Sequence, residues 1–532
     1  MQLTANLIEI LNRRIFVAEI TIKDGLIESV ASISDEADPS LPYVLPGFVD
    51  AHIHIESSML VPSEFARLAT PHGTVAVVTD PHEIANVMGV EGIDFMLDNA
   101  QQVPLKCCFG APSCVPATVF ETAGATIDAA SIGELLQRDA IGYLAEVMNY
   151  PGVLSGDAEV LAKIAHAKRL GKPVDGHAPG VTGEDAVNYI GAGITTDHEC
   201  TTYEEAAHKR DHGMKILIRE GSAAKNFDAL HPLISESPAE VMFCSDDKHP
   251  DELLVGHVNL LVKRAIDCGH DLFDVLRAAC VNPVQHYGLN VGLLSTGDPA
   301  DFILVDDLQQ WQVRATYIDG KLVAENGETK IIAVPTKEIN QFKCSLKSAA
   351  DFATEVIDEQ QPVIRAIDGS LVTIRETATY PFDKDDDILK LAVINRYSDG
   401  VPATAWIRGF GLRAGAIASC VGHDSHNILA VGVDDDSLAA AANLVIGQQG
   451  GIAAVSPEGS LQLPLPIAGI MSGDDGRTVA AQYEAIDGFV KELLHCPLSA
   501  PFMTLSFMAL LVIPSLKLSD KGLFDVESFD FV

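Results

Sequence analysis

The sequence predicts an α/β protein built on a (β/α)8 TIM-like barrel, with a small composite β-sandwich from the flanking segments and an additional α+β C-terminal domain. Three observations support this prediction. Short apolar strands alternate with helix-like segments in the middle of the chain, β-rich runs flank that region on both sides, and the pattern changes after about Pro335. The chain has 532 residues, which is too long for one hydrophobic core.

The composite β-sandwich is expected from residues 1–45 together with residues 285–335. In residues 3–30, short β-rich runs surround an Asp24-Gly25 turn, a pattern typical of hairpins. Similar runs return in residues 300–305 and 315–323. We therefore expect the two ends of this region to pair.

The barrel is expected from residues 46–284, where the sequence contains eight strand candidates at 45–49, 76–79, 105–109, 141–145, 173–176, 194–196, 215–219 and 240–244. Eight strands alternating with helices are the content of a (β/α)8 barrel. Residues 336–532 begin with a polar, mixed segment and continue with strand-like pieces, Gly-rich turns and an Ala-rich helix near 437–446. We expect a separate α+β domain there.

Charge and composition exclude several partners. The chain carries 36 Lys plus Arg against 74 Asp plus Glu, a net charge of −38, which repels phosphate backbones and anionic membranes. Its longest apolar tract, residues 507–514, is far shorter than the ~20 residues of a membrane helix. We expect neither nucleic acid nor membrane as a partner.

The expected compartment is the cytoplasm. The N-terminus lacks a basic region followed by a long apolar run, so a signal peptide is not indicated. The ten cysteines are scattered and include no CxxC pair. Free thiols in a reducing compartment fit this usage best.

The stretch "PGFVDAHIHIESSM" places His52 and His54 at the end of an apolar run. Side chains at i and i+2 of a strand project from the same face, so both imidazoles point together. At the carboxyl end of a first barrel strand, that place is the mouth of the barrel, where such enzymes have their active sites. A lone HxH is weak evidence, and a structural role would explain it equally well.

Most other predicted strands also end in a side chain of metal-ligand type. The set comprises Asp80, His82 and Glu83 after the second strand, Glu146 after the fourth, His177 after the fifth, His198 after the sixth, and Asp246 and Asp247 after the eighth. Imidazole and carboxylate together suit first-row divalent metals, and a pair of ions needs a bridging carboxylate. This order has a small chance of arising from core packing, so the sequence predicts a metal site.

The constellation resembles the amidohydrolase superfamily, which carries HxH on the first strand, a bridging Lys or Glu on the fourth, His on the fifth and sixth, and Asp on the eighth. Glu146 stands where one branch has a carbamylated lysine. The strings "DAHIHIESSM", "TDPHEIANVMG", "EVMNYPGV", "DGHAPGVTG", "TTDHECTT", "REGSAAKN" and "CSDDKHP" are further similar to the bacterial adenine deaminase family. So are "VGHDSHNILAVG" and "PFMTLSFMALLVIPSLKLSDKGLFDV", so the resemblance spans nearly the whole chain.

The resemblance implies hydrolytic deamination of adenine at C6 to hypoxanthine and ammonia, a reaction of purine salvage. It implies a hydroxide bridging two divalent ions, held by His52, His54, Glu146, His177, His198 and Asp246. Mn or Fe is favoured, and Zn is also compatible with these ligands. Long acidic barrel proteins of this kind often pair, so a homodimer is expected.

The reaction needs at least one acid or base beyond the metals, because N1 must gain a proton and the leaving nitrogen needs another. Asp246 is our choice to take the proton of the hydroxide and deliver it to the leaving nitrogen. For N1 the candidates are Glu56 and Glu83, and either carboxylate could instead be solvated or cap a helix. The sequence does not choose between them.

Four residues are expected around the ligands or the substrate: His82, Asp247, His423 and His426. The string containing His82 could simply open a helix, with Asp80 as its cap. His423 and His426 lie three residues apart around an aspartate, a spacing that could bind metal, form a turn or contribute to the wall of the active site. We expect a wall without a third metal.

Two rival functions stay open. One is a cyclic-amide hydrolase of the hydantoinase or dihydroorotase kind, which shares the barrel and sandwich but normally carries lysine in place of Glu146. The other is a non-catalytic scaffold, although such a protein should have lost some of the six ligands. No PCxxC, GxGxxG after a strand, or GxxxxGK[ST] occurs, so the other class of zinc deaminase, a dinucleotide and ATP are not indicated.

Overall fold

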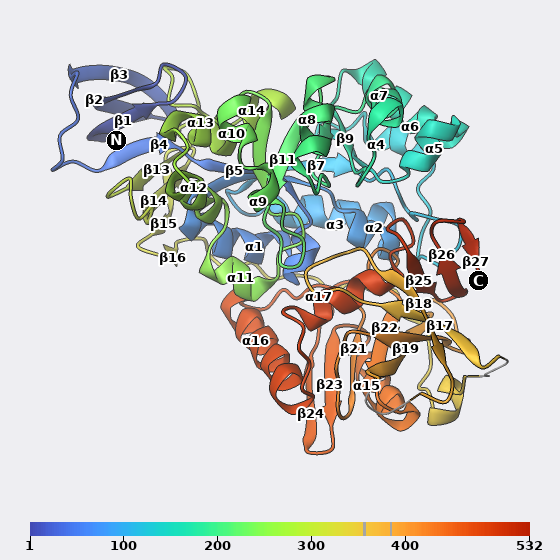
Figure 1. Cartoon of the computed structure of the whole chain (residues 1–532). Coiled ribbons are helices and arrows are strands. Elements are labelled where there is room, and N and C mark those ends of the chain that lie inside the picture. The colour runs from blue at the N-terminus through green and yellow to red at the C-terminus, as the bar shows by residue number, and fades with distance from the viewer. Residues whose placement is uncertain (355–357, 383–385) are drawn as a thin grey trace.

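The computed structural model describes residues 1–354, 358–382 and 386–532. Three regions are visible in Figure 1: a sheet around the N-terminus, a layer of alternating strands and helices, and a sheet-rich region that contains the C-terminus. None of the helices in the described ranges combines the length and the apolar content of a membrane span.

The N-terminal sheet joins strands from both flanking segments of the barrel. Its eight strands lie in the order β16 (Glu328–Thr329), β15 (Lys321–Glu325), β14 (Val313–Ile318), β13 (Phe302–Val305), β4 (Tyr43–Pro46), β1 (Gln2–Glu9), β2 (Arg14–Lys23) and β3 (Leu26–Ser34). β13 pairs antiparallel with β4, with Phe302 opposite Pro46. The two ends of the region therefore share one sheet; the domain limits themselves stay predictions.

The barrel layer contains eight parallel strands in two hydrogen-bonded groups. They are β5 (Phe48–Ile53), β6 (Thr74–Thr79), β7 (Lys106–Ala111), β8 (Ile141–Val147) and β9 (Val174–Gly176), followed by β10 (Thr196–Asp197), β11 (Lys215–Arg219) and β12 (Val241–Cys244). Hydrogen bonds from Thr195 N to Val174 O at 2.8 Å and from Asp246 N to His52 O at 2.9 Å connect the two groups. The strands thus form the predicted TIM-like arrangement.

Six of the eight predicted strands overlap an observed strand closely. The prediction at 194–196 shares only Thr196 with β10, and the first prediction was placed too early. Residues 45–49 fall across the end of β4 and the start of β5. Gly47 separates the two strands, and a Cβ at this position would meet Val75 at 2.2 Å. His52 therefore lies within β5 and His54 directly after it.

Helices surround the strands in the sequence order of a βα barrel. They are α1 (Pro62–Ala69), α2 (His82–Met88), α3 (Val90–Ala100), α4 (Ala129–Leu135), α5 (Tyr150–Ser155), α6 (Ala158–Leu170), α7 (Gly183–Gly191), α8 (Tyr203–Asp211), α9 (Phe227–Leu230), α10 (Leu233–Glu236), α11 (Pro250–Val255), α12 (Val258–Asp267), α13 (Leu272–Leu276) and α14 (Asn282–Tyr287). Buried apolar residues of strands and helices form the common core.

The C-terminal region is built on a second eight-stranded sheet. Its order is β18 (Ile374–Thr379), β17 (Gln360–Arg365), β20 (Ala403–Arg408), β19 (Ile388–Ile394), β22 (Ile428–Gly432), β21 (Ala416–Ser419), β23 (Ile452–Ser456) and β24 (Gly459–Leu463). The helices are α15 (Asp435–Gly447), α16 (Gly476–Leu493) and α17 (Pro501–Ser506), and β25 (Leu516–Ser519), β26 (Gly522–Asp525) and β27 (Asp530–Phe531) form a small sheet. Helix α16 of this region packs against α1 and α11, which follow the first and the last barrel strand; Figure 1 shows the region beside the barrel.

Candidate active site

His52 and His54 direct their ring nitrogens toward one point. Their Nε2 atoms lie 3.2 Å apart, and both side chains are buried. Nδ1 of His54 lies 3.2 Å from the backbone carbonyl of Asp80, so Nδ1 carries the proton in the neutral ring. The lone pair of Nε2 then faces inward, which is the state in which imidazole binds a metal.

Glu146 lies between two groups of histidines. Its Oε1 is 3.2 Å from Nε2 of His54, while its Oε2 is 2.7 Å from Nδ1 of His177 and 3.2 Å from Nε2 of His198. Each carboxylate oxygen thus faces a different set of imidazoles. This is the geometry in which one carboxylate can bridge two ions.

Asp246 completes the first group. Its Oδ1 lies 3.3 Å from Nε2 of His54 and 3.6 Å from Nε2 of His52. The backbone at Asp246 is left-handed, with φ of +54°, so strand alternation no longer applies after β12. The adjacent Asp247 consequently reaches the same cavity, where its Oδ1 accepts a hydrogen bond from Ser57 at 2.5 Å.

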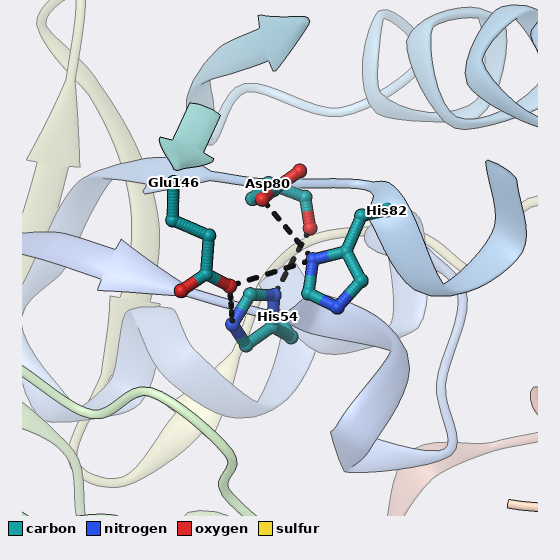
Figure 2. A group of neighbouring side chains, drawn as sticks. All are labelled: His54, Asp80, His82 and Glu146. Atoms are coloured by element: carbon teal, nitrogen blue, oxygen red, sulfur yellow. Dashed lines mark hydrogen bonds and ion pairs between the residues drawn. The ribbon is translucent and has the colours of Figure 1, made fainter. Parts of the chain in front are cut away.

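His82 and Asp80 adjoin Glu146 on the side of β6. Figure 2 shows His54, Asp80, His82 and Glu146 converging from three strand ends. Nδ1 of His82 is 3.1 Å from Oδ2 of Asp80 and 3.5 Å from Oε1 of Glu146. Helix α2 begins at His82 and Asp80 makes no cap hydrogen bond to it, so the capping role considered for Asp80 is not observed.

Arg219 and Glu199 belong to the site, and the sequence reasoning did not assign them a role. Arg219, the last residue of β11, donates from Nη1 to Oδ2 of Asp246 at 2.6 Å and from Nη2 to Oε2 of Glu199 at 2.9 Å. Oε1 of Glu199 lies 3.5 Å from Nε2 of His198 and 3.7 Å from Nδ1 of His177. Both residues follow the rule that polar side chains at strand ends belong to the site.

The two carboxylates considered for N1 lie in different environments. Oε1 of Glu56 accepts a hydrogen bond from the backbone N–H of Ile84 at 3.3 Å, in the first turn of α2. Glu83 instead lines the central cavity. Glu56 therefore binds the start of a helix, and Glu83 is the carboxylate that lines the cavity.

A loop of the C-terminal region reaches the barrel mouth through His423 and His426. Nδ1 of His423 contacts Oε1 of Glu83, and Nε2 of His426 contacts Oε2 of the same carboxylate. Nε2 of His423 lies 3.8 Å from Oδ2 of Asp247. The side chains of Glu83, Asp247, His423 and His426 are all buried.

The side chains at the barrel mouth surround a small central cavity with a volume of about 20 Å³. Its polar lining consists of His54, His82, Glu83, Glu146, His177, His198, Glu199, Asp246, Asp247, His423 and Asp424, and its apolar lining of Met148, Leu371, Phe507 and Leu510. The apolar residues other than Met148 come from the C-terminal region. Both regions of the chain therefore build one cavity.

The density of carboxylates makes the site attract positive charge. Burial would lower the pKa of His54 and His198, but Asp246 and Glu146 raise it well above the ordinary value in His54, and Glu146 raises it to about 9 in His198. Burial would likewise raise the pKa of Glu146, yet the surrounding histidines hold it well below its usual range. Protons or metal ions can supply the required positive charge.

The residues present fit divalent metal ions. Six groups of at least three His, Cys, Asp or Glu side chains with converging donor atoms occur among the described residues, and they include His52–His54–Asp246, His52–Glu146–His198 and His177–His198–Glu199. Buried Nδ1 of His52 and Nε2 of His177 have no hydrogen-bond partner. Imidazole and carboxylate donors in this mixture suit Mn, Fe and Zn.

Comparisons with known proteins agree along the whole chain. Residues 43–323 match the amidohydrolase family, and residues 368–530 match the adenine deaminase C-terminal domain. An adenine deaminase of Sulfurovum sp. (strain NBC37-1) is 56% identical over 532 residues, covering 100% of this chain and 99% of that protein. One from Salinibacter ruber is 53% identical over 540 residues, covering 100% and 98%.

Among solved structures, an adenosine deaminase from Xanthomonas campestris with bound Zn has a TM-score of 0.47 and 16% sequence identity, over 62% of this chain and 94% of that one. The relatives in sequence cover both the barrel and the C-terminal region. The chain therefore belongs to the adenine deaminase family of the amidohydrolases.

Proposed function

We propose that this protein hydrolyses adenine at C6 to hypoxanthine and ammonia. The names of its relatives support this activity. The observation that carries the proposal is the position of the Glu146 carboxylate between two groups of histidines. Its Oε1 faces His54, and its Oε2 faces His177 and His198. A carboxylate placed between two groups of ligands suits a pair of ions and the hydrolysis of a C–N bond.

The proposed ligands are His52, His54 and Asp246 for one ion, His177 and His198 for the other, and Glu146 for both. Glu199 is a further candidate beside the second ion. Mn or Fe is favoured over Zn, because carboxylate oxygens contribute at both positions. When bound, such a pair supplies a hydroxide at neutral pH, since a metal lowers the pKa of water to roughly 7.

Asp246 is proposed to hold the first proton of the attacking water and to pass it to the leaving nitrogen. Its Oδ1 faces the histidines, while Arg219 holds its Oδ2. Burial would raise the pKa of Asp246, but the charge of Arg219 and the neighbouring histidines hold it well below the usual range. The carboxylate is thus ionised and able to accept the proton.

Glu83 is proposed to give N1 its proton. Burial would lower the pKa of His423, but the charges of Glu83 and Asp247 raise it to about 9, so the contact between Glu83 and His423 contains a proton at neutral pH. That proton moves to N1 as C6 gains the oxygen. When the carbonyl of hypoxanthine forms, the proton of the new C6 hydroxyl returns to the Glu83–His423 pair, so the protons balance.

The apolar part of the cavity suits a flat purine ring. Met148, Leu371, Phe507 and Leu510 provide faces against which the ring can pack. Polar side chains at the opposite side suit the nitrogen edge, in the usual division of a small-molecule site. A cyclic amide hydrolase would share the barrel, yet the relatives' names favour adenine.

We further propose a role in cytoplasmic purine salvage. All ten cysteines carry free thiols, which suits a reducing compartment. The homodimer expected from the sequence stays a prediction.

The test is turnover of adenine by apoprotein reconstituted separately with Mn, Fe and Zn. We expect ammonia and hypoxanthine in equal amounts, with most activity at two metal equivalents per chain. Dihydropyrimidine amides serve as the competing substrates. Their hydrolysis without adenine turnover would overturn the proposal, and a lack of bound metal would favour the scaffold.

A further inference from the structure

Glu83 and the loop formed by residues 422–427 connect the barrel to the C-terminal region. Glu83 lies in the first turn of α2 and is 1% exposed. Its two oxygens contact one histidine each, Oε1 with Nδ1 of His423 and Oε2 with Nε2 of His426. One histidine in contact with each oxygen restricts both the position and the plane of the carboxylate.

The protonation state of His426 follows from its second nitrogen. The backbone N–H of Gly422 donates to Nδ1 of His426 at 3.2 Å, so Nδ1 is the acceptor in this ring. Nε2 then carries the hydrogen in the neutral ring, and Nε2 is also the nitrogen in contact with Glu83. The loop therefore holds the N–H side of His426 against the carboxylate.

The loop that carries both histidines is itself held in place. Tyr397 donates from its hydroxyl to the carbonyl of Ser425 at 2.6 Å, and Asn427 donates from Nδ2 to the carbonyl of Thr122 at 2.9 Å. The backbone at His426 is left-handed, with φ of +53°, a conformation that is unfavourable for a non-glycine residue. Surrounding contacts keep this residue in an unfavourable backbone state, as they often do at functional sites.

His423 has a second constraint on its ring. It stacks on Phe507 with a centroid distance of 5.0 Å and an interplanar angle of 17°. Its Nε2 faces Asp247 at 3.8 Å and its backbone N–H donates to the carbonyl of Ser506 at 3.1 Å. The ring is thus fixed between two carboxylates of the barrel and one apolar wall of the cavity.

We propose that His423 and His426 are positioning residues that hold Glu83 toward the reaction cavity, so that the C-terminal region completes the active site. The inference rests on the proposed function, because it assigns Glu83 a role in the deamination of adenine. The inference concerns the two imidazoles; the donor atoms of His82, Glu83 and Asp424 also lie close enough together to hold a metal ion, so bound metal is measured in every variant.

The experiment exploits which nitrogen of each histidine is used. The amide nitrogen of glutamine lies where Nε2 of histidine does, and that of asparagine lies where Nδ1 does. At position 426 we therefore expect H426Q to retain most of the turnover, and H426N and H426L to lose it. At position 423 we expect H423N, H423Q and H423L all to be impaired, because neither an amide nor an alkyl group supplies the proton that passes to N1. H423N alone should keep Glu83 in place, since its amide nitrogen lies where Nδ1 of His423 does.

The measured quantities are kcat and KM for adenine, bound metal per chain and the melting temperature. In the impaired variants kcat should fall by about 10- to 100-fold, because small displacements of a catalytic group have effects of this size. KM should change by less than about threefold, and metal content should stay as in the parent. S425A is the matched control, since Ser425 donates to Glu121 at 2.8 Å and does not contact Glu83; its kcat should be unchanged.

Several results would overturn the inference. H426L with parental kcat would do so, as would equal losses in H426Q and H426N. A drop of one metal equivalent in the impaired variants would identify the histidines as ligands instead. A crystal structure of H426L provides a test that needs no substrate: Glu83 should turn away from the cavity, and an unmoved carboxylate would refute the positioning role. Failure of the parent protein to turn over adenine would count against the proposed function alone.

Discussion

Arg219 donates a hydrogen bond to Oδ2 of Asp246 at 2.6 Å, and both side chains are only 5% exposed. This contact occupies one carboxylate oxygen and leaves Oδ1 directed at His52 and His54. The same guanidinium also binds Glu199. One buried cation therefore orients two carboxylates, one in each half of the proposed metal centre.

Replacement of Arg219 by methionine should impair activity and stability together. Removing one partner of a buried ion pair leaves the other charge uncompensated, at a cost of about 3–5 kcal/mol. We expect R219M to melt at a lower temperature and to lose at least about tenfold in kcat. The control is R264M, because Arg264 forms its ion pairs at the surface, where its side chain is 37% exposed. Parental kcat and melting temperature in R219M would refute this role.

Glu146→Gln tests the proposed bridge. Glutamine keeps the shape of Glu146 but offers one carbonyl oxygen and no negative charge, so it cannot serve both groups of histidines equally. Bound metal should fall from two equivalents to one or fewer, and kcat by at least about 100-fold. Metal analysis after gel filtration checks the first part. Glu91→Gln, at an exposed position of α3, should retain both properties.

Much of this centre is predictable because parallel strands bring their carboxyl ends together. The six expected ligands lie at or near strand ends and are up to 194 residues apart in sequence, from His52 to Asp246, and the structure brings their donor atoms within a few ångströms. The βα rhythm alone places them at one end of the sheet. The placement of these ligands can therefore be predicted from the sequence pattern without knowing how the side chains pack.

The remaining features depend on tertiary contacts that no local pattern contains. Glu56 and Glu83 look equivalent in sequence, yet Glu56 binds the backbone of α2 while Glu83 faces the cavity. Asp247 reaches the cavity only because Asp246 adopts a left-handed backbone. The pairing of Glu83 with His423 and His426 spans more than 300 residues, so its partners emerge only when the two regions pack.

The two glutamates should therefore respond differently to the same substitution. Glu83→Gln removes the proposed proton donor for N1, and kcat should fall by about 100- to 10,000-fold, the usual range for general acid catalysis. Glu56→Gln keeps a carbonyl oxygen that can accept the hydrogen bond of Ile84 N, so its kcat should change by less than about tenfold. Both variants should retain their metal, as measured by elemental analysis. The reverse ranking would move the proposed acid from Glu83 to Glu56.

Glu121 gives the interface between the two regions a predictable dependence on pH. Its carboxyl group accepts hydrogen bonds from Ser425 at 2.8 Å and from Thr118 at 3.2 Å. Burial, together with the charge of Asp424, nevertheless raises its pKa to about 8. The unfolded chain has an ordinary glutamate with a pKa of about 4.3.

The sign of the effect follows from the proton count. Below about pH 4 the carboxyl is protonated in both states and contributes no pH dependence. Between about pH 4 and pH 8 the folded protein keeps a proton that the unfolded chain has released, so rising pH lowers the free energy of unfolding. Above about pH 8 the carboxyl group of Glu121 is ionised in both states, and the full cost of burying its charge lowers the free energy of unfolding. The difference between the two pKa values gives an upper bound of about 5 kcal/mol for this cost, at about 1.4 kcal/mol per pKa unit.

Glu121→Gln should remove this dependence, because the amide stays neutral at every pH. We expect the melting temperature of E121Q to exceed that of the parent by a margin that grows from pH 5 to pH 9, in scanning calorimetry with the metal content held constant. Glu134→Gln, at an exposed position of α4, is the control and should follow the parent at each pH. A margin that stays the same across this range would mean that Glu121 is ionised in the folded protein, and that its hydrogen bonds with Ser425 and Thr118 outweigh the cost of burying its charge.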